Sequence, residues 1–173
     1  MTPRKPAKTN PQILEMPTQK MAVVHAKGAP DRVFSEFMPA LYGSVYTLKF
    51  DLKKKGLPTF KVSGLCARYP DAHLVPKEEW SIIIGLPIPE DTTYLPQKVP
   101  SIEVKTEQWQ YGTVAQILHL GPYEQEYATV ERLQQFIADS GYEIAGVHEE
   151  EYLTSPDAKV PKTIIRYPIK KKN

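Results

Sequence analysis

Apolar residues recur along two long stretches of the chain at steps of three and four, the spacing of one face of an α-helix. This pattern predicts a first helix over residues 31–54 and a second over about 123–140, with Gly141 as the C-terminal stop of the second. Pro39 falls inside the first pattern. Because proline lacks an amide hydrogen and its ring crowds the preceding turn, we expect it to kink or locally break that helix.

Shorter runs rich in β-branched and aromatic residues predict strands around these helices. The runs are 12–15, 21–27, 60–68, 80–86, 102–111, 113–120, 142–153 and 163–169. Gly112 separates two of them, so we expect 102–111 and 113–120 to pair as a hairpin. Many of the 17 prolines lie between the runs, where they do not interrupt a strand ladder.

Two similar hexapeptides indicate an internal repeat: Ile-Ile-Gly-Leu-Pro-Ile at 83–88 and Ile-Ile-Arg-Tyr-Pro-Ile at 164–169. Each follows a strand-like run, a glycine (Gly28 or Gly121) and a predicted helix. One copy cannot bury its apolar face alone, so we expect the two copies to pack together. The sequence therefore predicts an α+β fold of duplicated strand-helix-strand-strand units with pseudo-twofold symmetry, an antiparallel twisted sheet and two helices on one face. A seam between two copies is a common place for a ligand.

The length of 173 residues suits one domain. We expect a disordered tail over residues 1–10, followed by a single domain over 11–170. The two repeats of this domain are expected at about 11–100 and 101–170.

Charge and composition narrow the function classes. The net charge is +2, and the only basic runs, 53–55 and 170–172, lie at the end of an element or of the chain. At these positions the lysines indicate solvent-exposed ends of a helix and of the chain, so we expect no direct nucleic-acid partner. No run approaches the ~18 apolar residues of a membrane span, and no apolar segment follows the basic N-terminal residues, so we expect no membrane association and a cytoplasmic location.

Several kinds of catalytic or cofactor site lack their usual motifs. The single cysteine, Cys66, excludes an intramolecular disulfide and a zinc site built on several cysteines. The sequence has no dinucleotide-binding or Walker A glycine motif and no Gly-x-Ser-x-Gly elbow. His25 and His119 precede the two glycines without any close ligand spacing and are expected to be structural. We expect no cofactor and no metal.

The acidic segment 147–153 carries the most informative candidate chemistry. In a strand, alternation places His148, Glu150 and Tyr152 on one face. The opposite face holds Glu149 and Glu151, which we expect to be more exposed than Glu150. The alternative is a solvated acidic strand without a function of this kind.

A carboxylate among aromatic rings suits a cationic organic ligand, because charge attraction strengthens in a low dielectric and each cation–π contact adds roughly 0.5–2 kcal/mol. For any single aromatic residue, packing in the core or at its rim is the alternative. The candidate ligand-binding residues are Glu150, Tyr152, Tyr42, Tyr46, Trp109, Tyr69, Phe37, Cys66 and His148.

The sequence also resembles a known family. The matching segments are His-Leu-Gly-Pro-Tyr at 119–123 with the helix after it, Gly-Tyr at 141–142, Glu-Glu-Tyr-Leu at 150–153 and the closing hexapeptide at 164–169. Together they resemble the GyrI-like small-molecule-binding domain, which also serves as the effector module of multidrug-responsive regulators. Residues 41–50 resemble the stand-alone branch of that superfamily. The likeness covers about residues 12–169.

The resemblance implies a multidrug-type binding protein for lipophilic, planar, often cationic compounds. It places the pocket glutamate of the family on Glu150 and a tyrosine beside it on Tyr152. The chain leaves little room for a helix-turn-helix domain, so we do not expect a self-contained DNA-binding regulator.

Two alternatives stay open. Some stand-alone relatives resemble hydrolases of strained cyclopropane-bearing electrophiles, and in that case Glu150 would activate water while Tyr152 donates a proton. Those relatives carry tryptophan after the Gly-Leu of the first half, where this chain has Cys66. A binding protein would have no catalytic residues. The other alternative is an interaction protein that inhibits a larger enzyme such as a topoisomerase, through an acidic surface that includes Glu149 and Glu151.

Overall fold

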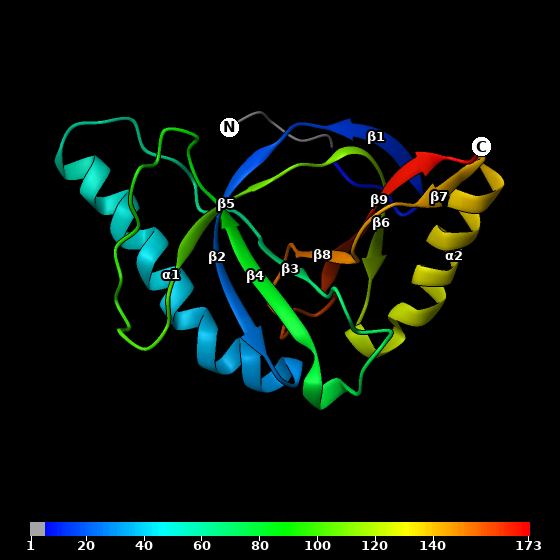
Figure 1. Ribbon diagram of the computed structural model, residues 1–173, viewed down its shortest axis with the longest axis horizontal. Coiled ribbons are helices and arrows are strands. Elements are labelled where there is room, and N and C mark those ends of the chain that lie inside the picture. The colour runs from blue at the N-terminus through cyan, green and yellow to red at the C-terminus, as the bar shows by residue number, and fades with distance from the viewer. Residues whose placement is uncertain (1–5) are drawn as a thin grey trace. The chain divides into compact units, whose positions relative to one another are not determined.

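A computed structural model describes residues 6–173 of the chain. The described residues divide into two compact units, the first formed by residues 19–109 and the second by residues 6–18 together with 110–173. Each unit consists of antiparallel strands and one long helix, which confirms the predicted α+β class (Figure 1).

The first unit contains a sheet in the order β5-β2-β4-β3. Its elements are β2 (Gln19–Lys27), α1 (Pro30–Lys54), β3 (Leu65–Arg68), a 3-10 turn η1 (Lys77–Glu79), β4 (Ser81–Pro87) and β5 (Lys105–Trp109). Helix α1 packs against β2 and β4, the two central strands (Figure 1).

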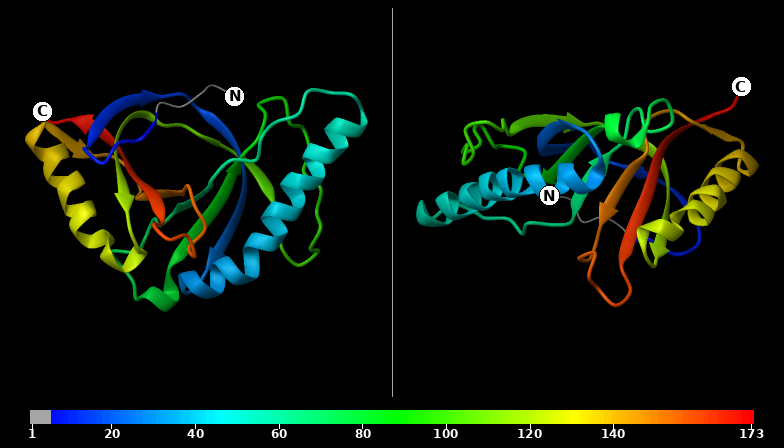
Figure 2. Two further views of the ribbon diagram at one scale, coloured as in Figure 1. Left: turned by 180° about the vertical axis from the view of Figure 1, so that it is seen from behind. Right: turned by 90° about the horizontal axis from the view of Figure 1, so that it is seen from below.

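The second unit contains a sheet in the order β1-β6-β9-β8, and β7 also pairs with β9. Its elements are β1 (Gln12–Met16), β6 (Gly112–Leu120), a 3-10 turn η2 (Tyr123–Gln125), α2 (Glu126–Asp139), β7 (Tyr142–Ile144), β8 (Glu149–Tyr152) and β9 (Lys162–Lys171). Figure 2 shows α2 lying along one face of this sheet. Leu133 and Ile137 of α2 pack there against Ile117 and Ile165 in the core.

Helix α1 runs without interruption from Pro30 to Lys54, so the expectation that Pro39 breaks it is wrong. Pro39 lies on the exposed side of the helix. The opposite side buries a continuous stripe against the sheet, made of Val33, Ala40, Leu41, Ser44, Val45 and Leu48. Because this stripe packs on both sides of the proline, tertiary contacts hold the helix together across the missing hydrogen bond.

The two glycines that precede the helices occupy similar turns. Gly28 and Gly121 have φ values of 138° and 125°, in a region that residues with a side chain rarely adopt. In the antiparallel pairings, Ile83 is opposite His25, which lies three residues before Gly28. Ile164 is opposite Leu118, which lies three residues before Gly121. The two hexapeptides therefore hold the same register within their own sheets.

The expected hairpin between 102–111 and 113–120 is wrong. Strand β5 pairs with β2 in the first unit, whereas β6 pairs with β1 and β9 in the second. Gly112 has a φ of 65° and sits at the start of β6, where the chain passes from one unit to the other. The structure consequently groups β1 with the second unit and β5 with the first, unlike the boundaries at 11–100 and 101–170.

Two predicted strands are shorter than expected. Only Leu65–Arg68 of the run 60–68 is a strand. The run 142–153 is divided into β7 and β8, and between them Ala145 N donates to Pro168 O at 2.8 Å. Gly146 lies so close to Pro168 that a Cβ there would stand 2.7 Å from the proline Cγ. This close crossing ends the regular pairing.

Part of the expected tail, residues 1–5, lies outside the described residues. Residues 6–10 form no helix or strand. Lys8 is nevertheless held to the second unit, because its carbonyl accepts a hydrogen bond from Leu118 N at 2.8 Å.

Candidate functional site

The side chains of β8 and of the residue before it separate onto two faces, as the alternation predicts. On one face Glu150 accepts contacts from its neighbours at i−2 and i+2: His148 Nε2 lies 2.7 Å from Glu150 Oε2, and Tyr152 OH donates to Glu150 Oε1 at 3.4 Å. On the other face Glu149 and Glu151 both bind Arg166 of β9.

The expectation that Glu149 is more exposed than Glu150 is wrong, and Glu151 is about as exposed as Glu150. The side chain of Glu149 is only 2% exposed, compared with 12% for Glu150 and 13% for Glu151. Arg166 Nη1 donates to Glu149 Oε2 at 2.5 Å, and Tyr111 OH donates to the same carboxylate at 3.0 and 3.1 Å. A carboxylate can be buried when it is paired and hydrogen-bonded in this way. The missed signal is Arg166 itself, a charged residue inside the apolar closing hexapeptide.

Glu150 belongs to a network that reaches two further elements. His148 Nδ1 lies 2.7 Å from Tyr167 OH of β9, and the His148 ring meets the Tyr167 ring edge-on at 5.1 Å. Gln134 of α2 donates from Nε2 to Tyr167 OH at 3.4 Å. The Glu150 carboxylate is therefore positioned from β8, β9 and α2 together.

The sequence analysis did not identify Glu126, the first residue of α2, as part of this site. Its carboxyl is hydrogen-bonded to that of Glu150, while its Oε1 is buried with no hydrogen-bond partner among residues 6–173. Burial and the neighbouring charge of Glu150 raise the pKa of Glu126 to about 9. At neutral pH Glu126 is protonated, so its hydroxyl donates to the Glu150 carboxylate. An acidic residue in a first helical turn is common, which is why its position gave no signal.

Tyrosines border the two acids. The Tyr123 ring, on η2, meets the Tyr152 ring edge-on with centroids 5.6 Å apart. Burial first, and then the charges of Glu126 and Glu150, raise the pKa of the Tyr123 hydroxyl. Burial likewise raises the pKa of Tyr167. Both phenols stay neutral near pH 7, so the cluster combines one carboxylate, one protonated acid and neutral aromatic rings. We call Glu126, Glu150, His148, Tyr123, Tyr152 and Tyr167 the Glu150 cluster.

Six candidate residues lie in the first unit. Tyr42 and Tyr46 of α1 stack with centroids 6.3 Å apart, and the stack continues to Phe50 at 6.2 Å. Burial, followed by proximity to Tyr46 and Cys66, raises the pKa of Tyr42. Tyr42, Tyr46 and Cys66 thus lie close together, while Phe37 is half-buried elsewhere on α1.

Trp109 and Tyr69 are core residues of the first unit, with exposed fractions of 2% and 8%. The Arg68 guanidinium lies 3.7 Å from the centre of the Trp109 ring. On Gly85 of β4, an added Cβ would stand 3.2 Å from Trp109 Cη2. Tyr69 packs edge-on against Trp80 at 5.8 Å. These contacts fit the packing alternative for both residues.

The two histidines before the glycines have structural partners. His119 Nδ1 lies 2.7 Å from Thr129 Oγ1 and its Nε2 lies 3.0 Å from Pro122 O. His25 Nε2 contacts Glu107 Oε2. Within residues 6–173, no group of three His, Cys, Asp or Glu side chains is arranged to hold a metal ion.

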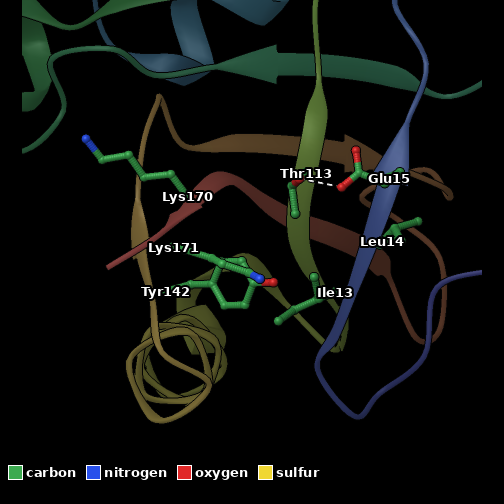
Figure 3. A pocket seen from close by; sticks show the side chains of 7 residues that line it. All are labelled: Ile13, Leu14, Glu15, Thr113, Tyr142, Lys170 and Lys171. Atoms are coloured by element: carbon green, nitrogen blue, oxygen red, sulfur yellow. Dashed lines mark hydrogen bonds between the residues drawn. The ribbon is translucent and has the colours of Figure 1, made fainter. Parts of the chain in front are cut away.

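A separate hollow of about 600 Å³ lies on the second unit (Figure 3). It is lined by Ile13, Leu14, Glu15, Thr113, Tyr142, Lys170 and Lys171. None of the candidate residues lines this hollow. Glu15 is hydrogen-bonded to Thr113. Lys170 forms an ion pair with Glu143 at 3.4 Å and points away from the other lining residues in Figure 3. The Glu150 cluster remains the better candidate, because it contains buried, interacting titratable groups.

A family model describes the same segments that form these two units. The model of the GyrI-like small-molecule binding domain matches residues 9–170. The chain belongs to this family. It is therefore a small-molecule binding domain in the general sense that the family description gives. A comparison with curated proteins found no match.

Solved structures with this fold include three informative GyrI-like neighbours. An uncharacterised conserved protein from Listeria innocua is 25% identical, with a TM-score of 0.82 and coverage of 95% of this chain and 94% of that one. A hydrolase from Listeria innocua is 24% identical, with a TM-score of 0.80 and the same coverage. The EcmrR C-terminal domain is 14% identical, with a TM-score of 0.69 and coverage of 94% and 98%. The likeness to the last two shows the fold. Neither helix in the described part of the chain has an apolar stretch that could cross a membrane.

Proposed function

We propose that this chain binds lipophilic, aromatic, often cationic small molecules, and that Glu150 supplies the charge that holds the cation. The observation that supports this most strongly is the environment of Glu150, a carboxylate 12% exposed and hydrogen-bonded to His148 and Tyr152. It is accessible to a ligand but largely withdrawn from solvent.

The electrostatics of the cluster favour a cation. Tyr152 OH donates a hydrogen bond to Glu150, and the raised pKa of Glu126 keeps a second full negative charge from forming beside it at neutral pH. In a partly desolvated site the charge of Glu150 is screened less than it would be in water. The faces of Tyr123 and Tyr152 offer cation–π contacts and stacking to a planar ligand.

The stacked Tyr42 and Tyr46 rings are our further candidates for contacts with a planar ligand, together with Phe37 and Cys66. Tyr46 is 40% exposed and presents its ring to solvent. Trp109 and Tyr69 pack in the core of the first unit, and we do not propose that they contact a ligand directly.

The experiment is a fluorescence titration with ethidium, a planar aromatic monocation, against wild type, Glu150→Gln and Glu143→Gln. Glutamine keeps the size of glutamate and removes its charge. Glu143 is a matched control, because it is a carboxylate of the same unit with 46% exposure and a surface partner, Lys170. Weaker binding by Glu150→Gln alone supports the proposal. Equal binding by all three proteins would refute it.

A hydrolase is the second candidate, and the Glu126–Glu150 pair favours it. Two adjacent acids of which one is protonated and one ionised can serve as general acid and general base. Two solved neighbours from Listeria innocua are also named hydrolases. In this reaction Glu150 takes a proton from water, the water oxygen bonds to a ring carbon of a strained cyclopropane, the ring C–C bond breaks, and Tyr152 or Glu126 supplies the proton to the departing carbon framework.

Incubation with a cyclopropane-bearing electrophile tests the second candidate by mass spectrometry. A product heavier by one water, formed by wild type but not by Glu150→Gln, is the outcome expected of a hydrolase. Recovery of unchanged electrophile bound to the protein is the outcome expected of a binding protein.

A further inference from the structure

One oxygen of the Glu126 carboxyl receives no hydrogen bond from the described part of the chain. Its Oε1 is buried and has no hydrogen-bond partner within residues 6–173. The carboxyl is hydrogen-bonded to Glu150. Glu150 already accepts a hydrogen bond from Tyr152 OH and contacts His148 Nε2. A buried acceptor without a donor is costly, and a ligand that brings a donor would remove that cost.

The groups around Glu126 all oppose a negative charge on it. They are Glu124 on η2 and Glu150 on β8, and burial acts in the same direction. The other titratable groups of the cluster are Tyr123 on η2, His148 and Tyr152 at β8, and Tyr167 on β9. Glu126 therefore keeps its proton until a positive charge enters the cluster.

We infer that Glu126 is the second acid of the Glu150 site, and that the site takes aromatic dications, whose second charge replaces the proton shared by Glu126 and Glu150. This inference rests on the proposed function, since it assigns a ligand class to the same site. A monocation needs only Glu150. A dication pairs with both carboxylates through its two charges, an N–H group on its ring system can donate to Glu126 Oε1, and the Glu126 proton leaves to solvent.

Proton release makes the affinity for a dication depend on pH. Between about pH 6.5 and 8.5, below the pKa of about 9 of Glu126, release of one proton raises the affinity up to tenfold per pH unit. A monocation that pairs with Glu150 alone displaces no proton from Glu126. The difference between the two ligand types therefore isolates Glu126.

Propidium and ethidium are suitable probes, because they share the phenanthridinium ring and carry two and one positive charges. For wild type, the affinity for propidium should rise more steeply with pH than the affinity for ethidium. Titration calorimetry in buffers of different ionisation enthalpy should show about one proton released per propidium and about none per ethidium. In Glu126→Gln the extra pH dependence and the proton release should disappear, and propidium should lose at least tenfold more affinity than ethidium at pH 8.5.

Equal pH dependence for the two dyes in wild type would overturn the inference, and so would equal losses in Glu126→Gln. Both outcomes leave the proposed function intact as long as ethidium binding still depends on Glu150. Failure of both dyes to bind, or indifference of both to Glu150→Gln, would overturn the proposed function together with this inference. The wild-type pH series and proton count decide the question even where Glu126→Gln does not fold.

Discussion

Arg166 in β9 lies directly opposite Glu149 in β8, and its Nη1 donates to Glu149 Oε2 at 2.5 Å. Both side chains are 2% exposed. Arg166 also donates from Nε to Gln116 Oε1 at 3.0 Å and from Nη2 to Glu151 Oε1 at 3.3 Å. This buried pair fixes β8 against β9 and thereby sets which face of β8 presents Glu150.

Replacing Arg166 by methionine should lower the free energy of unfolding by roughly 3–5 kcal/mol, because it leaves Glu149 buried without its cation. Urea denaturation measures this loss. The double variant Arg166→Met with Glu149→Leu should recover much of the stability, since the unpaired charge is then absent. The control is Lys170→Met at an exposed pair, where a change of about 0.5 kcal/mol or less is expected. A single variant as stable as the control would show that the buried pair does not organise β8.

Glu126→Gln should change how stability depends on pH. The pKa of Glu126 is raised from 4.5 to about 9 in the folded protein, mainly by burial. Its contribution to stability is therefore complete below pH 4.5 and is lost as the pH rises towards 9. Relative to wild type, the variant should gain stability with rising pH, by roughly 1–3 kcal/mol at the upper end. Thermal melts of both proteins across this range measure the difference, and a constant difference would contradict a protonated Glu126.

Gly85→Ala should destabilise the first unit by roughly 1–3 kcal/mol through overpacking. The new methyl would stand 3.2 Å from Trp109 Cη2 and from Met21 Cε, and 3.3 Å from the carbonyl oxygen of Ala22. Gly43→Ala in α1 is the matched control, because its nearest neighbours are Lys98 atoms at 3.5 Å. There the helix should gain up to ~1 kcal/mol. Comparable melting temperatures for the two variants would show that Trp109 is not packed against Gly85.

The local patterns of the sequence predicted the elements well. Spacings of three and four predicted both helices, and two-residue alternation placed Glu150 with His148 and Tyr152. The internal repeat stays a prediction, which the equal registers of Ile83 and Ile164 support.

Features that depend on partners far along the chain could not be predicted. The burial of Glu149 depends on Arg166 in another strand, and the grouping of β1 with β6 depends on pairing across about a hundred residues. Glu126 was missed because only the fold brings the start of α2 to the Glu150 carboxylate. Alternation gives the face of a side chain but not what covers that face.

The central claim is that the charge of Glu150 holds a cationic aromatic ligand, and binding of ethidium and of phenanthridine, its neutral parent ring, tests it most directly. For ethidium, Glu150→Gln should cost roughly 1–3 kcal/mol, about five- to 150-fold in affinity, because the lost attraction acts in a partly desolvated site. Phenanthridine should lose much less, since its binding depends on stacking and apolar burial that the substitution leaves in place. Equal losses for the two compounds would show that Glu150 acts through its shape, and they would contradict the account.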